Sequence, residues 1–211
     1  MWRLLHALKG AANVSESKAK RMICWKCHEP VGGPVCVGCG AIQPPRPGSD
    51  PFSLLGIERR FSIETSEVDS AWRELSRRVH PDRFAGRSAV ERRMSLQWTA
   101  NINEARRILR EPRTRAHFLA TGLATPAEDR KIQLSPEFLE EMFDLQMEIK
   151  MDPSGKRPEV EARSEVLWTE IRSLFAHWES EGGALDGVEQ LLAQLRYVDN
   201  ALTMTESSES G

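Results

Sequence analysis

The sequence predicts an all-α protein in which a helical hairpin and an antiparallel three-helix bundle follow a small cysteine-rich knuckle. Three observations lead to this fold class. Apolar residues recur at steps of three and four in several long segments, which is the spacing of one face of an α-helix. Proline and glycine separate these segments, and short connections favour antiparallel neighbours. All cysteines lie within the first 39 residues, so the knuckle differs in composition from the helices.

Composition limits the function classes. The chain has 211 residues, of which 40% are hydrophobic and 28% charged, so it has room for one or two small cores. No apolar run reaches membrane-spanning length, and no basic stripe is interleaved with aromatic residues, so neither a membrane nor nucleic acid is an expected partner. Residues 73–93 hold seven Lys/Arg against three Asp/Glu, whereas residues 127–211 hold eight against nineteen. We therefore expect the two halves to bind different partners.

Residues 1–21 are basic, because they contain five Lys/Arg and only one acidic residue, Glu16. A helical apolar stripe in this segment would contain Trp2, Leu4, Leu5 and Leu8. The segment resembles a mitochondrial presequence and predicts a location in the mitochondrial matrix, with a cytosolic pool left open. The alternative is a disordered basic arm.

Residues 22–43 form the predicted knuckle, which carries two Cys-x-x-Cys hooks eight residues apart. The four cysteines are Cys24, Cys27, Cys36 and Cys39. Two such hooks can place four thiolates tetrahedrally around one zinc ion. Because so short a segment cannot bury a core, we expect its fold to depend on this structural zinc. Disulfides, free thiols and bound iron or an iron-sulfur cluster stay open as alternatives, and His28 is expected to face solvent.

Residues 44–49 are rich in proline and predict a stiff spacer between the knuckle and a helical segment at 50–112. Asp50 is a candidate cap for a first short helix at 51–55, with Pro51 at its first position.

A basic amphipathic helix is predicted to end at His80-Pro81-Asp82. Its apolar side holds Val68, Trp72, Leu75 and Val79. Its basic side holds Arg73, Arg77 and Arg78. Pro81 cannot continue the helix and moves His80 out of the α region, so the triplet should form an exposed corner. No nucleophile-base pair or phosphate-binding glycine loop accompanies this corner. We therefore expect charge-assisted hydrogen bonding to another protein, and no enzymatic activity.

This helical arrangement resembles the J domain, in which a short helix precedes a basic helix, the His-Pro-Asp turn and an antiparallel helix, here at about 90–109. The resemblance implies that His80, Pro81, Asp82 and the three arginines dock on a DnaK-type heat-shock ATPase, here the mitochondrial one, and stimulate its ATP hydrolysis. Ala71 stands where many J domains carry another basic residue.

Further blocks resemble the HscB-type co-chaperones, which are J proteins dedicated to iron-sulfur cluster transfer. The blocks are Ile102-Asn103-Glu104-Ala105, Arg115-Ala116-His117-Phe118-Leu119, Phe138-Leu139-Glu140-Glu141-Met142 and Leu195-Arg196-Tyr197-Val198-Asp199. The likeness extends over residues 51–202, and the cysteine knuckle resembles the amino-terminal extension of animal members. It implies a co-chaperone that binds an IscU-type iron-sulfur cluster scaffold protein, delivers it to the ATPase and promotes cluster transfer.

The remaining sequence divides into a connecting helix and loop at 113–134, a bundle at 135–204 and a disordered tail at 205–211. Three amphipathic helices are expected in the bundle, at 136–151, 159–179 and 185–203, with glycine and proline between them. The buried stripe of the second helix should contain Leu167, Ile171, Leu174, Phe175 and Trp178. That of the third should contain Leu185, Val188, Leu192, Leu195 and Leu202.

The helix at 136–151 carries two apolar stripes. The first contains Phe138, Met142, Leu145 and Ile149, and the second Leu139, Phe143 and Met147. Either both stripes are buried, or the second is an exposed apolar strip with an acidic border, as in a helix-face interface. The resemblance to HscB-type proteins implies that scaffold binding uses Leu139, Glu140, Phe143, Asp144, Met147 and Tyr197. Glu140 and Met147 depart from the residue types of some relatives.

Two other functions stay open at this point. A general J-domain co-chaperone would capture extended apolar segments of many unfolded clients. A zinc-ribbon protein would bind DNA or RNA with a steep dependence on salt. Weak self-association also stays open.

Overall fold

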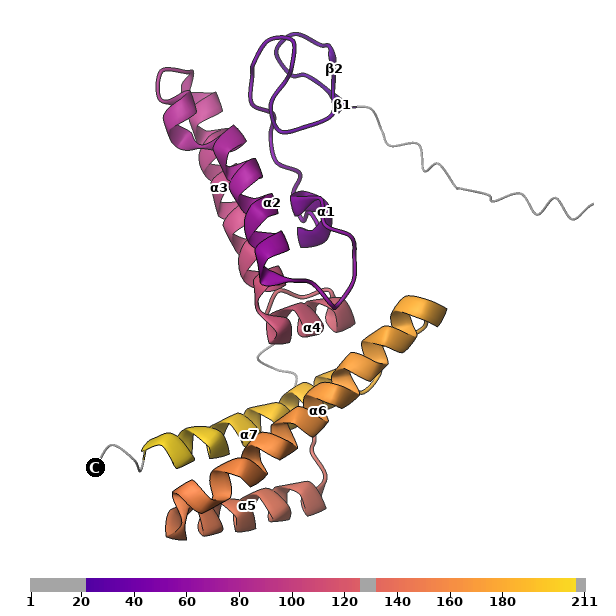
Figure 1. Ribbon diagram of the computed structural model, residues 1–211. Helices are drawn as coiled ribbons and strands as arrows, with labels where there is room; N and C mark the ends of the chain where they lie inside the picture. Colours follow the sequence, from indigo (N-terminus) through magenta and orange to yellow (C-terminus); the bar gives the residue numbers. More distant parts are fainter. Residues whose placement is uncertain (1–21, 126–131, 208–211) are drawn as a thin grey trace, which may run out of the picture.

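The computed structural model describes residues 22–125 and 132–207 (Figure 1). The predicted presequence lies outside the described residues, as do residues 208–211 of the predicted tail. The prediction that the tail begins at residue 205 was wrong, because the last helix continues to Ser207. The elements are β1 (Met22–Ile23), β2 (Pro30–Val31), α1 (Pro51–Leu55), α2 (Thr65–Val79), the 3-10 turn η1 (Pro81–Phe84), α3 (Ala89–Arg110), α4 (Pro112–Thr121), α5 (Pro136–Met151), α6 (Pro153–Glu181) and α7 (Val188–Ser207). The described chain is mostly helical, which confirms the predicted fold class.

Helices α2 and α3 form an antiparallel hairpin, and α1 packs beside it (Figure 1). The predicted cap of α1 is confirmed, because Asp50 Oδ2 accepts the backbone N–H of Ser53 at 2.9 Å and Pro51 begins the helix. Near the open end of the hairpin, Arg106 Nε donates to Asp69 Oδ1 at 2.8 Å. This hydrogen bond holds the pKa of Asp69 below its usual range, although burial acts in the opposite direction. The pair therefore joins α2 and α3 far from the His-Pro-Asp corner.

Helix α4 connects the hairpin to the bundle. It begins directly after α3, where the Glu111 carboxylate accepts the backbone N–H groups of Arg113 and Thr114 at 3.0 and 2.6 Å. Burial opposes ionisation of Glu111, but these hydrogen bonds and the Thr114 hydroxyl outweigh it and lower its pKa. Gly122, with φ 74°, ends the helix in the left-handed conformation.

The hairpin and the bundle share one hydrophobic core. The rings of Phe61 and Phe175 stack with centroids 4.3 Å apart, and the Phe61 backbone N–H donates to Glu179 Oε1 at 2.6 Å. Ile171 and Leu195 are buried in the same core. The stripe predicted for the second bundle helix thus packs partly on the J-domain-like region. A shared core makes the two regions one packed body.

A second core lies at the other end of the bundle, where α5 packs on α6 and α7. Its buried residues are Met142, Leu145, Ile149, Val160, Val198 and Ala201. The prediction that α6 starts near residue 159 was wrong, because Asp152 accepts the N–H of Gly155 at 3.0 Å and Pro153 is the first helical residue. An aspartate cap followed by proline starts a helix, so the segment read as a separator is the first turn of α6.

The knuckle has its own small core but is not held apart by the prolines. Cys24, Val31, Cys36 and Ala41 are buried together. Ile42, however, belongs to the main helical core, and Trp98 Nε1 of α3 donates to the Gln43 carbonyl at 2.7 Å. The expectation that residues 44–49 separate the knuckle from the hairpin is therefore wrong. The chain makes its contacts with α3 before the spacer begins.

Among the described residues, no helix combines the length and the apolar character needed to cross a bilayer.

Candidate metal centre and partner surfaces

The two cysteine hooks have the same backbone turn. The N–H of His28 donates to the carbonyl of Cys24 at 3.0 Å, and the N–H of Gly40 donates to that of Cys36 at 2.9 Å. Both turns need a positive φ directly after the second cysteine, which is 64° at His28 and 69° at Gly40. His28 is exposed, as predicted. Its part in the turn was missed because a histidine, unlike Gly40, does not signal this conformation.

The four sulfur atoms fit a tetrahedral metal ion. They all lie within 4.8 Å of one another, and none is in a disulfide. The Cys24–Cys39 and Cys27–Cys36 Sγ pairs are each 3.6 Å apart. Four thiolates around zinc would be about 3.8 Å apart, because each Zn–S bond is about 2.3 Å long. The described residues therefore present a preformed four-thiolate site of the predicted composition.

Hydrogen bonds concentrate on one sulfur. Burial of Cys24 opposes ionisation, but donors that include the backbone N–H groups of Cys27 and Lys26 outweigh it and lower the pKa of Cys24 to about 6. Gln43 adds a side-chain donor, with its Nε2 at 3.3 Å from Cys24 Sγ. Sequence reasoning missed Gln43, since a single glutamine after the second hook is no recognised motif. The arrangement stabilises a thiolate, which is the form that binds a metal.

The His-Pro-Asp corner has the predicted geometry. Helix α2 ends at Val79, and His80 leaves the α region with φ −56° and ψ 134°. His80 Nδ1 accepts the backbone N–H of Asp82 at 3.3 Å and lies 3.5 Å from Asp82 Oδ2. The Asp82 side chain is 90% exposed. The corner is therefore held by its own residues and leaves a carboxylate free to accept hydrogen bonds.

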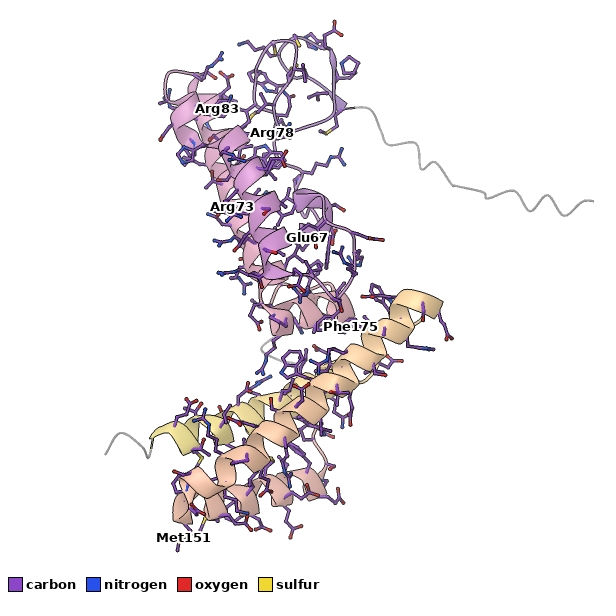
Figure 2. All side chains as sticks on the ribbon, viewed as in Figure 1. Glu67, Arg73, Arg78, Arg83, Met151 and Phe175 are labelled. Atoms are coloured by element: carbon purple, nitrogen blue, oxygen red, sulfur yellow. The ribbon has the colours of Figure 1, made fainter. Side chains whose placement is uncertain are left out.

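The predicted arginines are exposed on α2, where Figure 2 labels Arg73 and Arg78. Arg83 of η1 was not predicted to take part, but its Nη1 donates to the Arg77 carbonyl at 3.1 Å and so closes the end of α2. Arg78 differs from the others because its guanidinium lies against the knuckle, beside Gly33. The basic surface at this end therefore includes side chains of α2 and η1, and one of its arginines, Arg78, lies against the knuckle.

The second apolar stripe of α5 is exposed. Leu139, Phe143 and Met147 are 39%, 63% and 48% exposed, whereas Met142 is 1% exposed. This result excludes the alternative that both stripes are buried. Met151, one turn further along, is also exposed and extends the strip to the end of α5 (Figure 2). Met151 was not predicted, although its spacing from Met147 places it on the same side of the helix.

Tyr197 of α7 packs on α5 at Phe138, a residue of the first apolar stripe that directly precedes Leu139 in the sequence. Its ring meets that of Phe138 edge to face, with centroids 6.1 Å apart. Glu140 and Asp144 are exposed on α5, as the prediction of an acidic border requires. Five of the predicted scaffold-binding residues are therefore exposed on α5, and Tyr197 is exposed on α7 beside Phe138. We call the exposed residues Leu139, Phe143, Met147, Met151 and Tyr197 the α5 strip.

The structure does not bring the two partner surfaces together. In Figure 2 the labels of Arg78 and Arg83 lie at one end of the molecule and that of Met151 at the other. Phe175, in the core shared by hairpin and bundle, lies between them. The two surfaces therefore lie apart on one body.

No protein-family model matches the chain. A stretch of 96 residues is 45% identical to the co-chaperone protein HscB homolog of Azoarcus sp. (strain BH72), covering 45% of this chain and 54% of that protein. The chain thus aligns with about half the length of such bacterial relatives.

The likeness to mammalian proteins is longer. Over 201 residues the chain is 28% identical to the iron-sulfur cluster co-chaperone protein HscB of Mus musculus, covering 90% of this chain and 83% of the mouse protein. The crystal structure of human co-chaperone protein HscB superposes with a TM-score of 0.70 at 25% identity, covering 89% of this chain and 98% of the human one. The fold and the sequence thus agree with the resemblance drawn from the motifs, and the chain is a homologue of the HscB-type co-chaperones.

Proposed function

We propose that this protein is a co-chaperone of iron-sulfur cluster biogenesis. In this proposal the α5 strip binds an IscU-type scaffold protein, with Glu140 and Asp144 at its edge. The His80-Pro81-Asp82 corner and the arginines of α2 dock on a DnaK-type heat-shock ATPase. The protein itself performs no chemistry, because the reacting groups for ATP hydrolysis belong to the ATPase.

One observation carries the proposal: an exposed apolar strip and an exposed carboxylate corner lie at opposite ends of one packed body. Isolated apolar side chains are common on protein surfaces, but a contiguous strip with an acidic border is typical of a helix-face interface. The shared core around Phe61 and Phe175 keeps the two surfaces at a fixed separation.

The function follows from this rigidity. A scaffold bound to the α5 strip and an ATPase bound to the corner are held on the same body, so once one of them is bound, its encounter with the other becomes intramolecular. Their effective concentration rises without any new contact between them. Scaffold delivery and stimulation of hydrolysis then become coupled.

Single-turnover ATP hydrolysis by the partner ATPase tests the proposal. The chain alone should accelerate hydrolysis, and addition of an IscU-type scaffold should accelerate it further. An equal response to unrelated extended apolar peptides would instead favour a general protein-folding co-chaperone. Absence of any acceleration by the properly folded chain would contradict the proposal.

We also propose that Cys24, Cys27, Cys36 and Cys39 hold one structural zinc ion. The sulfur spacing and the amide donors around Cys24 support a four-thiolate shell. Elemental analysis should find one zinc per chain, and X-ray absorption should find four sulfur ligands. A mixed oxygen shell, or iron in place of zinc, would contradict this assignment.

We propose that the protein resides in the mitochondrial matrix. This proposal depends on residues 1–21 acting as a presequence. Fusion of these residues to a fluorescent protein should direct it to mitochondria, and a fusion that begins at residue 22 should stay in the cytosol. Identical distributions of the two fusions would contradict the proposal.

A further inference from the structure

Gln43 lies at the junction of the cysteine site and the helical hairpin. Only 2% of the residue is exposed, and every polar group of its side chain is used. Its Oε1 accepts the backbone N–H of Trp25 at 3.2 Å, and its Nε2 donates to the Ala41 carbonyl at 2.8 Å and to Cys24 Sγ at 3.3 Å. The side chain therefore joins the first hook, which contains Cys24 and Trp25, to the segment that follows the second hook.

The backbone of Gln43 makes the connection to α3. Its N–H donates to the Pro34 carbonyl at 2.8 Å, and its own carbonyl accepts Trp98 Nε1 at 2.7 Å. A neighbouring carbonyl, that of Ile42, accepts Trp25 Nε1 at 2.7 Å. One residue thus contacts a metal-ligating sulfur through its side chain and the hairpin through its main chain.

The contact on α3 continues to the corner. Ser95 lies three residues before Trp98, so the two side chains are neighbours on the helix surface. Ser95 is fully buried, and its Oγ donates to the Val79 carbonyl at 2.6 Å. Val79 is the last residue of α2 and directly precedes His80. A chain of contacts therefore runs from Cys24 through Gln43, Trp98 and Ser95 to the start of the His-Pro-Asp corner.

The knuckle also contacts the basic surface directly. A methyl group added to Gly33 would lie 2.9 Å from Nη2 of Arg78, whereas one added to the neighbouring Gly32 would meet nothing within 4 Å. The backbone of Gly33 thus limits where the Arg78 guanidinium can lie. Figure 1 shows β1 and β2 beside the end of the hairpin that carries this arginine.

We propose that Gln43 is a positioning residue that couples the four-cysteine metal centre to the docking end of the α2–α3 hairpin. With the metal bound, Gln43 holds Trp98 and fixes the knuckle against Arg78. With the metal lost, the first hook no longer orients the Gln43 amide, and the corner becomes less ordered. The inference rests on the proposed docking function and adds to it a dependence on metal occupancy.

The chemistry favours an amide at this position. Four thiolates around a divalent ion carry a net charge of −2, and neutral N–H donors disperse that charge without a competing proton. A glutamine also offers an acceptor for Trp25 and a donor for Cys24 at once. A methionine of similar size keeps the volume and removes both functions, and Gln43→Met is therefore the informative substitution.

Zinc release and hydrogen exchange test the coupling on the zinc-loaded full chain. Gln43→Met should lose zinc to a chelator about 10-fold to 100-fold faster, as is typical when a supporting partner of a metal ligand is removed. Amide exchange over residues 77–98 should also be faster. Gln97→Ala is the matched control, because Gln97 is exposed beside Trp98. Faster zinc loss with wild-type exchange over 77–98 would overturn the coupling, as would wild-type behaviour in both measurements.

Trp98→Phe keeps an aromatic side chain but removes the pyrrole part of the indole with its Nε1 donor, so it provides a second variant if Gln43→Met fails to fold. It should accelerate exchange over residues 77–98. In the cobalt-substituted chain it should leave the thiolate-to-metal charge-transfer band unchanged. Gln43→Met should move that band to lower energy, because a sulfur that loses a hydrogen bond donates electron density more readily. Wild-type exchange in Trp98→Phe would overturn the coupling.

The adjacent glycines complete the test at the basic surface. Gly33→Ala should displace the Arg78 guanidinium and weaken ATPase docking several-fold at low salt, whereas Gly32→Ala should not. Equal docking by the two variants would overturn the contact with Arg78. If the wild-type chain does not dock at all, the proposed function fails, but zinc release and exchange still decide the coupling.

Discussion

The two surfaces proposed to bind partners are built in different ways. The His80-Pro81-Asp82 corner is made by consecutive residues, and its 3.3 Å hydrogen bond joins residues only two positions apart. The α5 strip combines residues of α5 with Tyr197 of α7, which the fold of the bundle brings alongside. The corner is thus a local structure, and the strip is a tertiary one.

This difference determines how each surface responds to substitution. A charge at the exposed corner contributes little to the free energy of unfolding, so its removal affects binding alone. Apolar residues of α5 contribute to stability or to binding according to the side of the helix on which they lie. The following predictions are ordered from the largest expected effect to the smallest.

Asp82→Asn should abolish stimulation of the partner ATPase. The substitution keeps the shape of the side chain but removes the charge, and loss of one partner of a charge-assisted contact costs about 2 to 5 kcal/mol of binding. Single-turnover hydrolysis measures the effect, and circular dichroism should find unchanged helicity. His80→Gln should act similarly, because His80 Nδ1 accepts the N–H of Asp82. Wild-type stimulation by folded Asp82→Asn would show that docking occurs elsewhere.

Combined Leu139→Ala, Phe143→Ala and Tyr197→Ala substitutions should abolish scaffold binding measured by calorimetry. All three side chains are exposed, so the melting temperature should change by only a few degrees. Stimulation of the ATPase without scaffold should persist, since the corner lies at the other end of the molecule. Scaffold affinity equal to that of the wild type would place recognition on another face of the bundle.

Met142→Ala and Phe143→Ala compare the two sides of α5 with adjacent residues. Met142→Ala should lower the free energy of unfolding by about 2 to 5 kcal/mol, because it leaves a cavity in the core of the bundle. Phe143→Ala should change it by about 0.5 kcal/mol or less and should instead weaken scaffold binding. Urea denaturation measures both variants. Equal destabilisation would show that the strip is packed in solution.

Arg77→Glu with Arg78→Glu should have the smallest effect on the bound complex and should mainly slow association. Charges at the rim of an interface steer encounter, so the rate should fall about tenfold or more at low salt and approach the wild-type rate at high salt. Stopped-flow measurements at several ionic strengths test this. A change confined to the dissociation rate would place these arginines inside the interface.

Local features of this molecule could be predicted from the sequence because neighbouring residues produce them. The Asp50 cap, the helix end before Pro81 and the two cysteine hooks each depend on a few adjacent residues and on backbone geometry. Their positions in the structure agree with those predictions. The start of α6 was missed although its signal is local, because Asp152 and Pro153 were interpreted as a separator and not as a cap.

Other features depended on tertiary packing. Both stripes of α5 are apolar, and only the position of α6 and α7 buries Met142 and exposes Phe143. Likewise, the prolines after the knuckle predicted separation, but burial of Ile42 and the Trp98 hydrogen bond to Gln43 attach it to the hairpin. The sequence by itself determined which segments are helical, where the corner forms and which residues can hold a metal. Only the tertiary structure decided which apolar faces are covered, because burial depends on contacts between residues far apart in the chain.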